Sequence, residues 1–120
     1  VGVNFDSGHA FLVEGQTLPA ALRKIGSWLF TTHLQDNFGE NDDHQAPGMG
    51  FIDWAPLLAT LQEIGYQGPL MLELTGWGVK ANRTVPQLRQ YPLERELLLA
   101  QAYLQALWCK NQNCGQTTGL

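Results

Sequence analysis

Segments with the features of strands and segments with the features of helices alternate along this chain, and this alternation constrains the fold more than any other feature. Apolar, β-rich runs at about 1–5, 28–34 and 69–74 are expected to form strands. Each is followed by a segment with the apolar spacing of a helix. A β-α-β-α-β-α order favours a parallel α/β sheet with right-handed crossovers.

Apolar residues three or four positions apart predict the three helices. The first follows Thr17, a plausible N-cap, and tolerates Pro19 in its first turn. The second runs over 54–64, with Asp53 as its cap and Gly65 near its end. The third begins at 93 or 94 and ends at about 108. The expected apolar positions are Leu18, Ala21, Leu22, Ile25 and Leu29, then Leu57, Leu58, Leu61 and Ile64, then Leu97, Leu98, Tyr103, Leu104 and Leu107.

The composition is that of one globular domain. The chain has 120 residues and 44% hydrophobic residues, enough to build a core. We expect the domain to cover residues 1–110 and a flexible tail to cover 111–120. Cys109 and Cys114 have no histidine nearby, so they predict neither a zinc site nor a disulfide framework.

Charge and hydropathy weigh against two classes of partner. The formal net charge of −4 would repel a phosphate backbone, and the basic residues are scattered, so the sequence weighs against nucleic acid as a partner. No apolar run approaches the roughly 20 residues of a membrane span, and the first residues lack a signal-peptide pattern. We therefore expect no membrane partner and a cytoplasmic location.

Three strands are too few to close a barrel, because an eight-stranded (β/α)8 barrel typically needs about 250 residues. Either the remaining strands lie on a missing N-terminal segment, or they come from another chain. A sequence that begins directly in a strand suggests a truncated product. The strand edges at 1–5 and 69–74 would favour pairing with another copy, so a homo-oligomer is the second possibility.

Charged and imidazole side chains gather where each expected strand ends. In parallel α/β folds the C-terminal ends of the strands share one mouth, so residues far apart in sequence would converge there. The polar stretch after the first strand, residues 6–9, is expected to be a loop, and 38–50 a long functional loop. The converging residues are Asp6 and His9, His33 and Asp36, Asp42 and His44, and Glu73.

A mixed set of carboxylates and imidazoles is typical of a divalent-metal site. Such ligands suit Mn, Zn, Co or Fe better than calcium, which prefers oxygen alone. Several carboxylates buried together raise each other's pKa and destabilise the fold, and a divalent cation removes that conflict. The sequence therefore predicts a divalent metal ion as cofactor.

Each residue also has a structural interpretation. Asp6 has the position of a turn or cap aspartate, and His9 and His44 have that of surface loop histidines. His33 fits a hydrogen-bonded core histidine. Glu73 is the strongest candidate, because glutamate is seldom buried among apolar residues without a charge partner. In addition, Asp36 is expected to orient a neighbouring group rather than bind metal, and Asp43 to be solvated.

The phrases around these residues resemble the sugar phosphate isomerase and epimerase group with the xylose-isomerase-like TIM barrel, which is related to endonuclease IV. The matching phrases occur in family order over most of residues 1–74. They are Phe5-Asp6-Ser7-Gly8-His9-Ala10, Thr32-His33-Leu34-Gln35-Asp36-Asn37, the segment from Asp42-Asp43-His44 to Trp54, and Gly65 to Leu74. The resemblance implies the C-terminal part of a TIM barrel.

By this resemblance, Asp6, His33 and Glu73 stand at metal-ligand positions of the family. His9 matches a position that contacts substrate in the epimerases and an additional zinc in the nucleases. Asp42 and His44 match the pair that completes that additional zinc site, although many sugar isomerases also retain them. A second glutamate of the family, which acts with Glu73, has no counterpart here.

The resemblance implies a divalent-metal sugar isomerase or epimerase, with Mn, Mg, Co or Zn as the ion and a sugar or sugar phosphate as the substrate. Glu73 would act in proton transfer, His9 would bind substrate oxygens, and Trp77 or Phe38 would stack on the sugar. Two alternatives stay open. One is a zinc phosphodiesterase of the endonuclease IV type, and the other is a non-enzymatic truncated module that self-associates.

Overall fold

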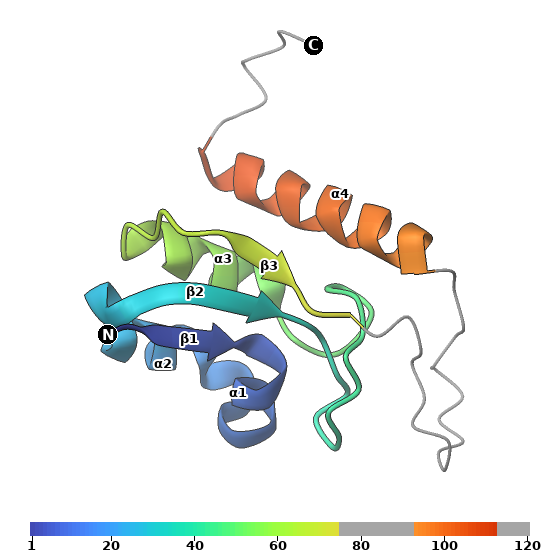
Figure 1. The fold of residues 1–120 in the computed structure, drawn as a ribbon, viewed down its shortest axis with the longest axis horizontal. Coiled ribbons are helices and arrows are strands. Elements are labelled where there is room, and N and C mark those ends of the chain that lie inside the picture. The colour runs from blue at the N-terminus through green and yellow to red at the C-terminus, as the bar shows by residue number, and fades with distance from the viewer. Residues whose placement is uncertain (75–92, 113–120) are drawn as a thin grey trace, which may run out of the picture.

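Three parallel strands in the order β1-β2-β3 form the sheet, and helices connect them (Figure 1). The computed structural model describes residues 1–74 and 93–112. Predictions about Trp77 and Cys114 therefore lie outside the described residues. The elements are β1 (Val3–Asp6), α1 (Ser7–Glu14), α2 (Leu18–Ile25), β2 (Leu29–Leu34), α3 (Trp54–Glu63), β3 (Leu70–Leu72) and α4 (Leu93–Gln112), with 3-10 turns at Gly15–Thr17 and Gly26–Trp28.

The register of the sheet aligns the C-terminal ends of the strands. Asp6 of β1 pairs with His33 of β2, and His33 pairs with Met71 of β3. The amide of Glu73 donates to the carbonyl of Leu34 at 3.0 Å and continues the pairing past β3. The predicted parallel α/β arrangement is confirmed, although β3 is shorter than the expected strand over 69–74.

One face of the sheet packs against the helices. Side chains from this face, including Phe5 and Leu34, join the buried apolar residues of α2 and α3 in a single core. Burial of such residues drives folding, because each removes apolar surface from water. The predicted helix positions Leu18 and Leu22, and Leu57, Leu58 and Leu61, are among the most buried of the core.

The described helices leave the opposite face of the sheet uncovered. Phe30 is 76% exposed and Met71 is 47% exposed. Val3 pairs with Leu29 and Asn4 with Thr31, so β2 carries one extra residue, Phe30, at a bulge. Past the bulge, the alternation of a strand places His33 on the same face as its neighbours Asp6 and Met71. The polar strand ends therefore lie at one end of an uncovered face.

The expected loop over residues 6–9 is wrong. Asp6 caps a helix instead: its Oδ1 accepts a hydrogen bond from the amide of His9 at 2.9 Å, and α1 begins at Ser7. The expected first helix is also shorter than its apolar spacing suggested, because α2 ends at Ile25 before Gly26, whose φ of 51° suits glycine. Leu29 therefore begins β2 rather than ending a helix.

Helix α4 is longer and more exposed than predicted. It continues to Gln112, whereas the sequence placed its end near residue 108. Leu104 is buried, but Leu98 is 67% exposed, so the expectation that Leu98 covers the sheet is wrong. None of the helices in the described part of the chain is long and apolar enough to cross a membrane.

The segment 38–50 is a loop held at its base by a short antiparallel bridge. Asp36 and Gln45 exchange two backbone hydrogen bonds of 2.8 and 2.9 Å. The segment therefore leaves β2, turns back past Asp42 and His44, and returns beside the end of the strand. Because of this return, both side chains lie near the strand ends.

Candidate metal centre

Three predicted ligands meet at the C-terminal ends of the strands. Asp6 ends β1, His33 lies near the end of β2, and Glu73 follows β3. One possible ligand atom from each lies within 4.8 Å of the other two. The Nδ1 atom of His33 is 3.5 Å from Oε2 of Glu73. We call this set the strand-end cluster.

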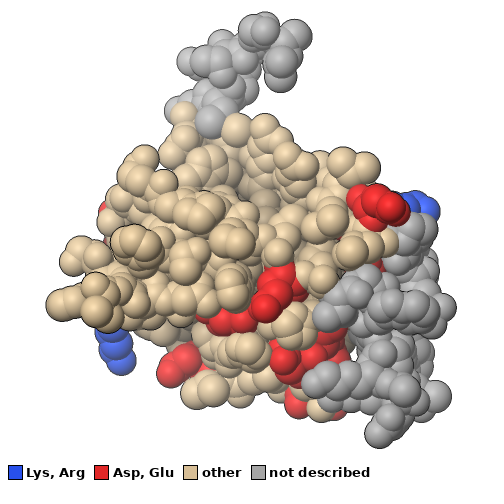
Figure 2. Space-filling model, viewed as in Figure 1, with Lys and Arg blue, Asp and Glu red and all other residues tan. Residues whose placement is uncertain are grey.

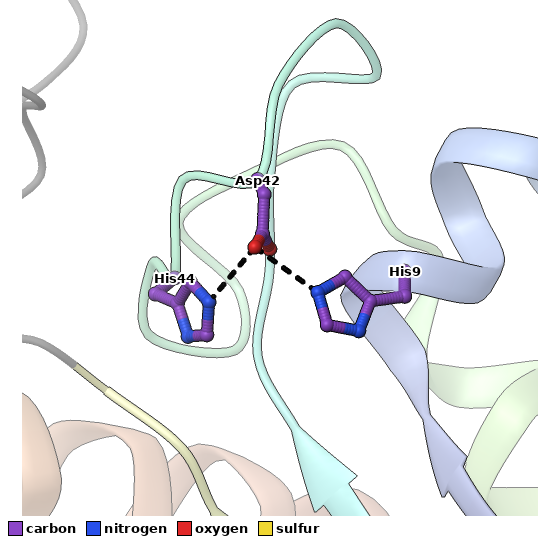
Figure 3. A group of neighbouring side chains, drawn as sticks. All are labelled: His9, Asp42 and His44. Atoms are coloured by element: carbon purple, nitrogen blue, oxygen red, sulfur yellow. Dashed lines mark hydrogen bonds and ion pairs between the residues drawn. The ribbon is translucent and has the colours of Figure 1, made fainter.

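His9, Asp42 and His44 form a second set, the loop cluster (Figure 3). Oδ2 of Asp42 lies 3.0 Å from Nε2 of His9 and 3.1 Å from Nε2 of His44. The two imidazole rings are nearly perpendicular and face the carboxylate from opposite sides. The structure thus divides the six predicted ligands into two neighbouring sets of three.

The contacts of His44 show which of its ring nitrogens carries a proton. Its Nδ1 lies 3.1 Å from the backbone carbonyl oxygen of Glu73, which can only accept a hydrogen bond, so Nδ1 carries the proton. Nε2 of His44 lies 3.1 Å from Oδ2 of Asp42, so this nitrogen either carries a second proton or turns a lone pair toward the carboxylate. Two lone pairs at this separation repel unless a proton or a cation lies between them. The donor set therefore fits a cation.

The backbone of His44 has a φ of 51°, in the left-handed region. Among the described residues other than glycine, His44 alone has a positive φ. Such a conformation costs about 1 kcal/mol for a side chain with a Cβ, and strained residues cluster at functional sites. This backbone conformation places the imidazole beside Asp42 and the carbonyl oxygen of Glu73.

Charges within the loop cluster shift two pKa values. The hydrogen bond with Asp42 raises the pKa of His9, against a smaller lowering by burial. Burial raises the pKa of Asp42, but hydrogen bonds from Gln35 and His9 and the charge of His44 outweigh it and lower that pKa overall. Near pH 6 the pair therefore favours a charged imidazole beside a charged carboxylate.

Gln35 supports both clusters in a way that the sequence did not indicate. Gln35, to which the sequence assigned no role, is fully buried, and its Nε2 lies 3.0 Å from Oδ1 of Asp42 and 3.3 Å from Oδ1 of Asp6. Asp36 is also fully buried and turns away from both clusters. The only sequence signal for Gln35 was a polar residue directly after an apolar strand.

Asp36 organises the base of the loop, as the sequence suggested for a residue that orients its neighbours. Its carboxylate accepts hydrogen bonds from the amides of Asn37, Gly48 and Ile52 and from the indole Nε1 of Trp54. Burial raises the pKa of Asp36, although these hydrogen bonds lower it in part. A carboxylate in this position fixes where the loop leaves the sheet and where it returns.

The surface near the strand ends is acidic. On the face drawn in Figure 2, Asp and Glu atoms form neighbouring groups in the middle, and Lys and Arg atoms lie at the margins. The whole chain carries 11 acidic and 7 basic residues. Such a face attracts cations and repels a phosphate backbone.

Comparisons with known proteins give one consistent family. The profile of the family described as xylose isomerase-like TIM barrel matches residues 1–99. The inosose isomerase of Bacillus licheniformis is 34% identical over 80 residues, which cover 62% of this chain and 28% of that protein. Three curated relatives match, and the chain spans only 23% to 28% of their length.

Solved structures agree with the sequence relatives. The xylose isomerase domain protein from Planctomyces limnophilus has a TM-score of 0.67 at 28% identity, covering 94% of this chain and 39% of that one. A D-tagatose 3-epimerase-like protein has a TM-score of 0.58 at 26% identity, covering 88% and 35%. The described strands and helices therefore correspond to part of a larger barrel.

Proposed function

The chain belongs to the xylose isomerase-like TIM-barrel family, and we propose that it supplies the metal-binding part of a divalent-metal-dependent sugar isomerase or epimerase. The predicted fold, a part of a (β/α)8 barrel, is confirmed by the parallel sheet and the barrel neighbours. The ion, the substrate and the activity belong to the proposal.

The observation that carries the proposal is the strand-end cluster. Its three ligands lie at or just after the ends of three successive strands and meet at the C-terminal end of the sheet, where TIM-barrel enzymes place their active sites. Oε2 of Glu73 is buried and has no hydrogen-bond partner among the described residues. An orphaned buried carboxylate oxygen beside an imidazole and a second carboxylate fits a divalent cation such as Mn, Mg, Co or Zn.

The chain's own residues then take distinct parts in the chemistry. A bound divalent ion would polarise the sugar carbonyl and stabilise negative charge on its oxygen. Glu73 would exchange a proton with the carbon next to that carbonyl, as the acid–base group on one side of the sugar. His9, which is 57% exposed at its side chain, would contact the substrate from the open side of the site.

The rest of the barrel completes this function. The described part of the chain supplies three strands, and the uncovered face that ends in Asp6, His33 and Glu73 corresponds to the interior of a barrel. The remaining strands, with a second acid–base group opposite Glu73, would come from a longer protein or from another subunit. The two edge strands β1 and β3 are the positions where they would pair.

The first test is the metal content of the purified chain by elemental mass spectrometry, for the native sequence and for Glu73→Gln. Glu63→Gln is the matched control, because the carboxylate of Glu63 binds Arg23 on the surface of α3 and belongs to neither cluster. We expect a retained divalent ion in the native chain and in the control, and its loss in Glu73→Gln. An ion held equally by Glu73→Gln, or by none of the three, would refute the proposed centre.

The loop cluster supports a second candidate, a zinc phosphodiesterase related to endonuclease IV. Three further ligands lie beside the strand-end cluster, and such enzymes use several zinc ions to activate water and stabilise a leaving oxygen. The acidic surface weighs against a nucleic-acid substrate. More than one zinc ion per chain together with cleavage of abasic DNA would favour this candidate, whereas turnover of a ketose would favour the isomerase.

The third possibility, a non-enzymatic module that self-associates, rests on the uncovered sheet face and the two open edges. Analytical ultracentrifugation tests it directly. A monomeric chain that isomerises a sugar would exclude it, whereas a stable oligomer without retained metal would favour it over either enzyme.

A further inference from the structure

Gln35 lies between the two clusters and contacts both. Its side chain is fully buried, and its amide nitrogen faces Asp6 of the strand-end cluster and Asp42 of the loop cluster. The same nitrogen is 3.4 Å from Nε2 of His44. Within the described part of the chain, no other uncharged side chain has hydrogen bonds to acidic ligands of both clusters.

The side-chain amide of Gln35 binds one oxygen of each carboxylate, and the other oxygen of each faces an imidazole. Oδ1 of Asp6 and Oδ1 of Asp42 both face Nε2 of Gln35. Oδ2 of Asp42 faces His9 and His44, and Oδ2 of Asp6 lies 3.2 Å from Nδ1 of His9. An amide NH2 has two hydrogens, so one group can hold both carboxylates at once.

The surroundings of Gln35 fix the orientation of its amide. Reversing the amide would turn its oxygen toward two carboxylates, where it would be repelled. A Cβ on Gly8 would clash with Oε1 and Cδ of Gln35, so only glycine leaves room for the amide. The hydroxyl of Ser7 also donates to the backbone carbonyl of Gln35 and accepts from its backbone N–H, and these two bonds hold the main chain of Gln35 in place.

The buried Oε1 of Gln35 has no hydrogen-bond partner among the described residues. An unsatisfied buried amide oxygen costs about 1–3 kcal/mol. An apolar side chain of similar volume would avoid this cost. The sequence therefore retains a glutamine at some expense of stability, which points to a role for its NH2 group.

We propose that Gln35 is a positioning residue that links the two candidate metal centres, because its amide holds Oδ1 of Asp6 and Oδ1 of Asp42 and leaves the second oxygen of each carboxylate for a metal ion. The inference rests on the proposed function, since it concerns how the chain's residues are held for metal ions. As a neutral donor, the amide orients two carboxylates without adding the positive charge that would compete with a divalent cation.

The test is titration of the metal-free chain with Zn²⁺ by calorimetry and with Co²⁺ by visible absorption, which reports the geometry of bound cobalt. The variant is Gln35→Met, which keeps the volume and removes both donors. The matched control is Gln62→Met, because Gln62 donates one hydrogen bond to the carbonyl of Trp108 and belongs to neither cluster. Circular dichroism establishes that each variant is folded.

We expect zinc affinity to fall about 10- to 100-fold in Gln35→Met, as for other residues that orient metal ligands, and the cobalt spectrum to change. The Gln62→Met variant should match the native chain in both measurements. Native affinity and an unchanged spectrum in Gln35→Met would overturn the role of Gln35 and leave the metal centres standing. A native chain that binds neither ion would overturn both proposals.

A second variant covers the case in which Gln35→Met does not fold. Gln35→Glu keeps the shape of the side chain but places a third carboxylate against Asp6 and Asp42. We expect its melting temperature without metal to fall and the rise on addition of Zn²⁺ to exceed that of the native chain, because a cation relieves the repulsion. An equal rise in the two proteins would overturn the proposal.

Discussion

The carboxylate of Asp36 accepts a hydrogen bond of 2.7 Å from the indole nitrogen of Trp54, and both side chains are buried. The same carboxylate binds the amides of Gly48 and Ile52. The bond therefore joins the end of β2, the return of the loop 38–50 and the start of α3.

Replacing Asp36 by alanine should destabilise the fold strongly, because several buried N–H donors lose their acceptor at once. We expect a loss of about 3 kcal/mol in the free energy of unfolding, measured by urea denaturation. Trp54→Phe removes only the indole donor and should cost about 1–2 kcal/mol. If Asp36→Ala unfolds at the same urea concentration as the native chain, the carboxylate does not organise the loop.

The metal-free protein should have a pH window in which the His9–Asp42 pair stabilises the fold. The raised pKa of His9 gives stability that is complete below the ordinary value of 6.5 and is lost as the pH rises through the folded pKa. The lowered pKa of Asp42 gives stability that is present above 3.8 and is lost as the pH falls through the folded pKa. The contribution of the pair should therefore be largest between these values.

Thermal melts of the metal-free chain from pH 3 to pH 9 measure this contribution. His9→Gln should remove the part lost on the alkaline side and leave the acid-side loss from other carboxylates. A His9→Gln profile that parallels the native profile over the whole range would contradict the assignment.

His44→Gly and His44→Ala both remove the imidazole, so their difference isolates the strain of the backbone. At a φ of 51°, alanine retains the Cβ conflict and glycine does not. We expect His44→Gly to be about 1 kcal/mol more stable than His44→Ala by urea denaturation without metal. Equal stabilities would mean that the loop relaxes when the imidazole is absent.

Zinc should stabilise the chain through His33, and a chelator should reverse the effect. At a zinc concentration 100 times the dissociation constant, ligand binding adds about 2.7 kcal/mol to the free energy of unfolding. His33→Gln should lose most of this gain from the strand-end cluster yet melt near the native temperature without metal, since His33 is 36% exposed at its side chain. A full zinc response in His33→Gln would exclude His33 as a ligand.

The sequence predicts the elements of this fold better than it predicts their ends. The spacing of Leu57, Leu58 and Leu61 predicts α3 almost to the residue, because all three side chains face one core. Helix α1 was missed as a whole, because Gly8 so close to a polar run is typical of a turn. Two tertiary features decide the structure of this segment: Asp6 accepts a capping hydrogen bond from the amide of His9, and the side chain of Gln35 occupies the space beside Gly8.

The candidate site was predictable as a set of ligands but not as an arrangement. Residues at the ends of parallel strands had to converge, which placed His33 near Glu73. The separation into two clusters depends on the path of the loop and on the backbone of His44, neither of which has a periodic pattern. Gln35 was not predicted, because an uncharged amide gives no sequence signal for a role at a metal site.

Strand order along the sheet follows strand order along the chain, and this has a kinetic consequence. Each strand pairs with the next one in sequence, so Asp6 meets His33 across 27 positions and His33 meets Met71 across 38. Parallel pairings at such separations form slowly, because each closes a long loop before its contacts stabilise it. An ion held by Asp6, His33 and Glu73 would bind only after the strand ends have met, and it would therefore favour the closed sheet over its open forms.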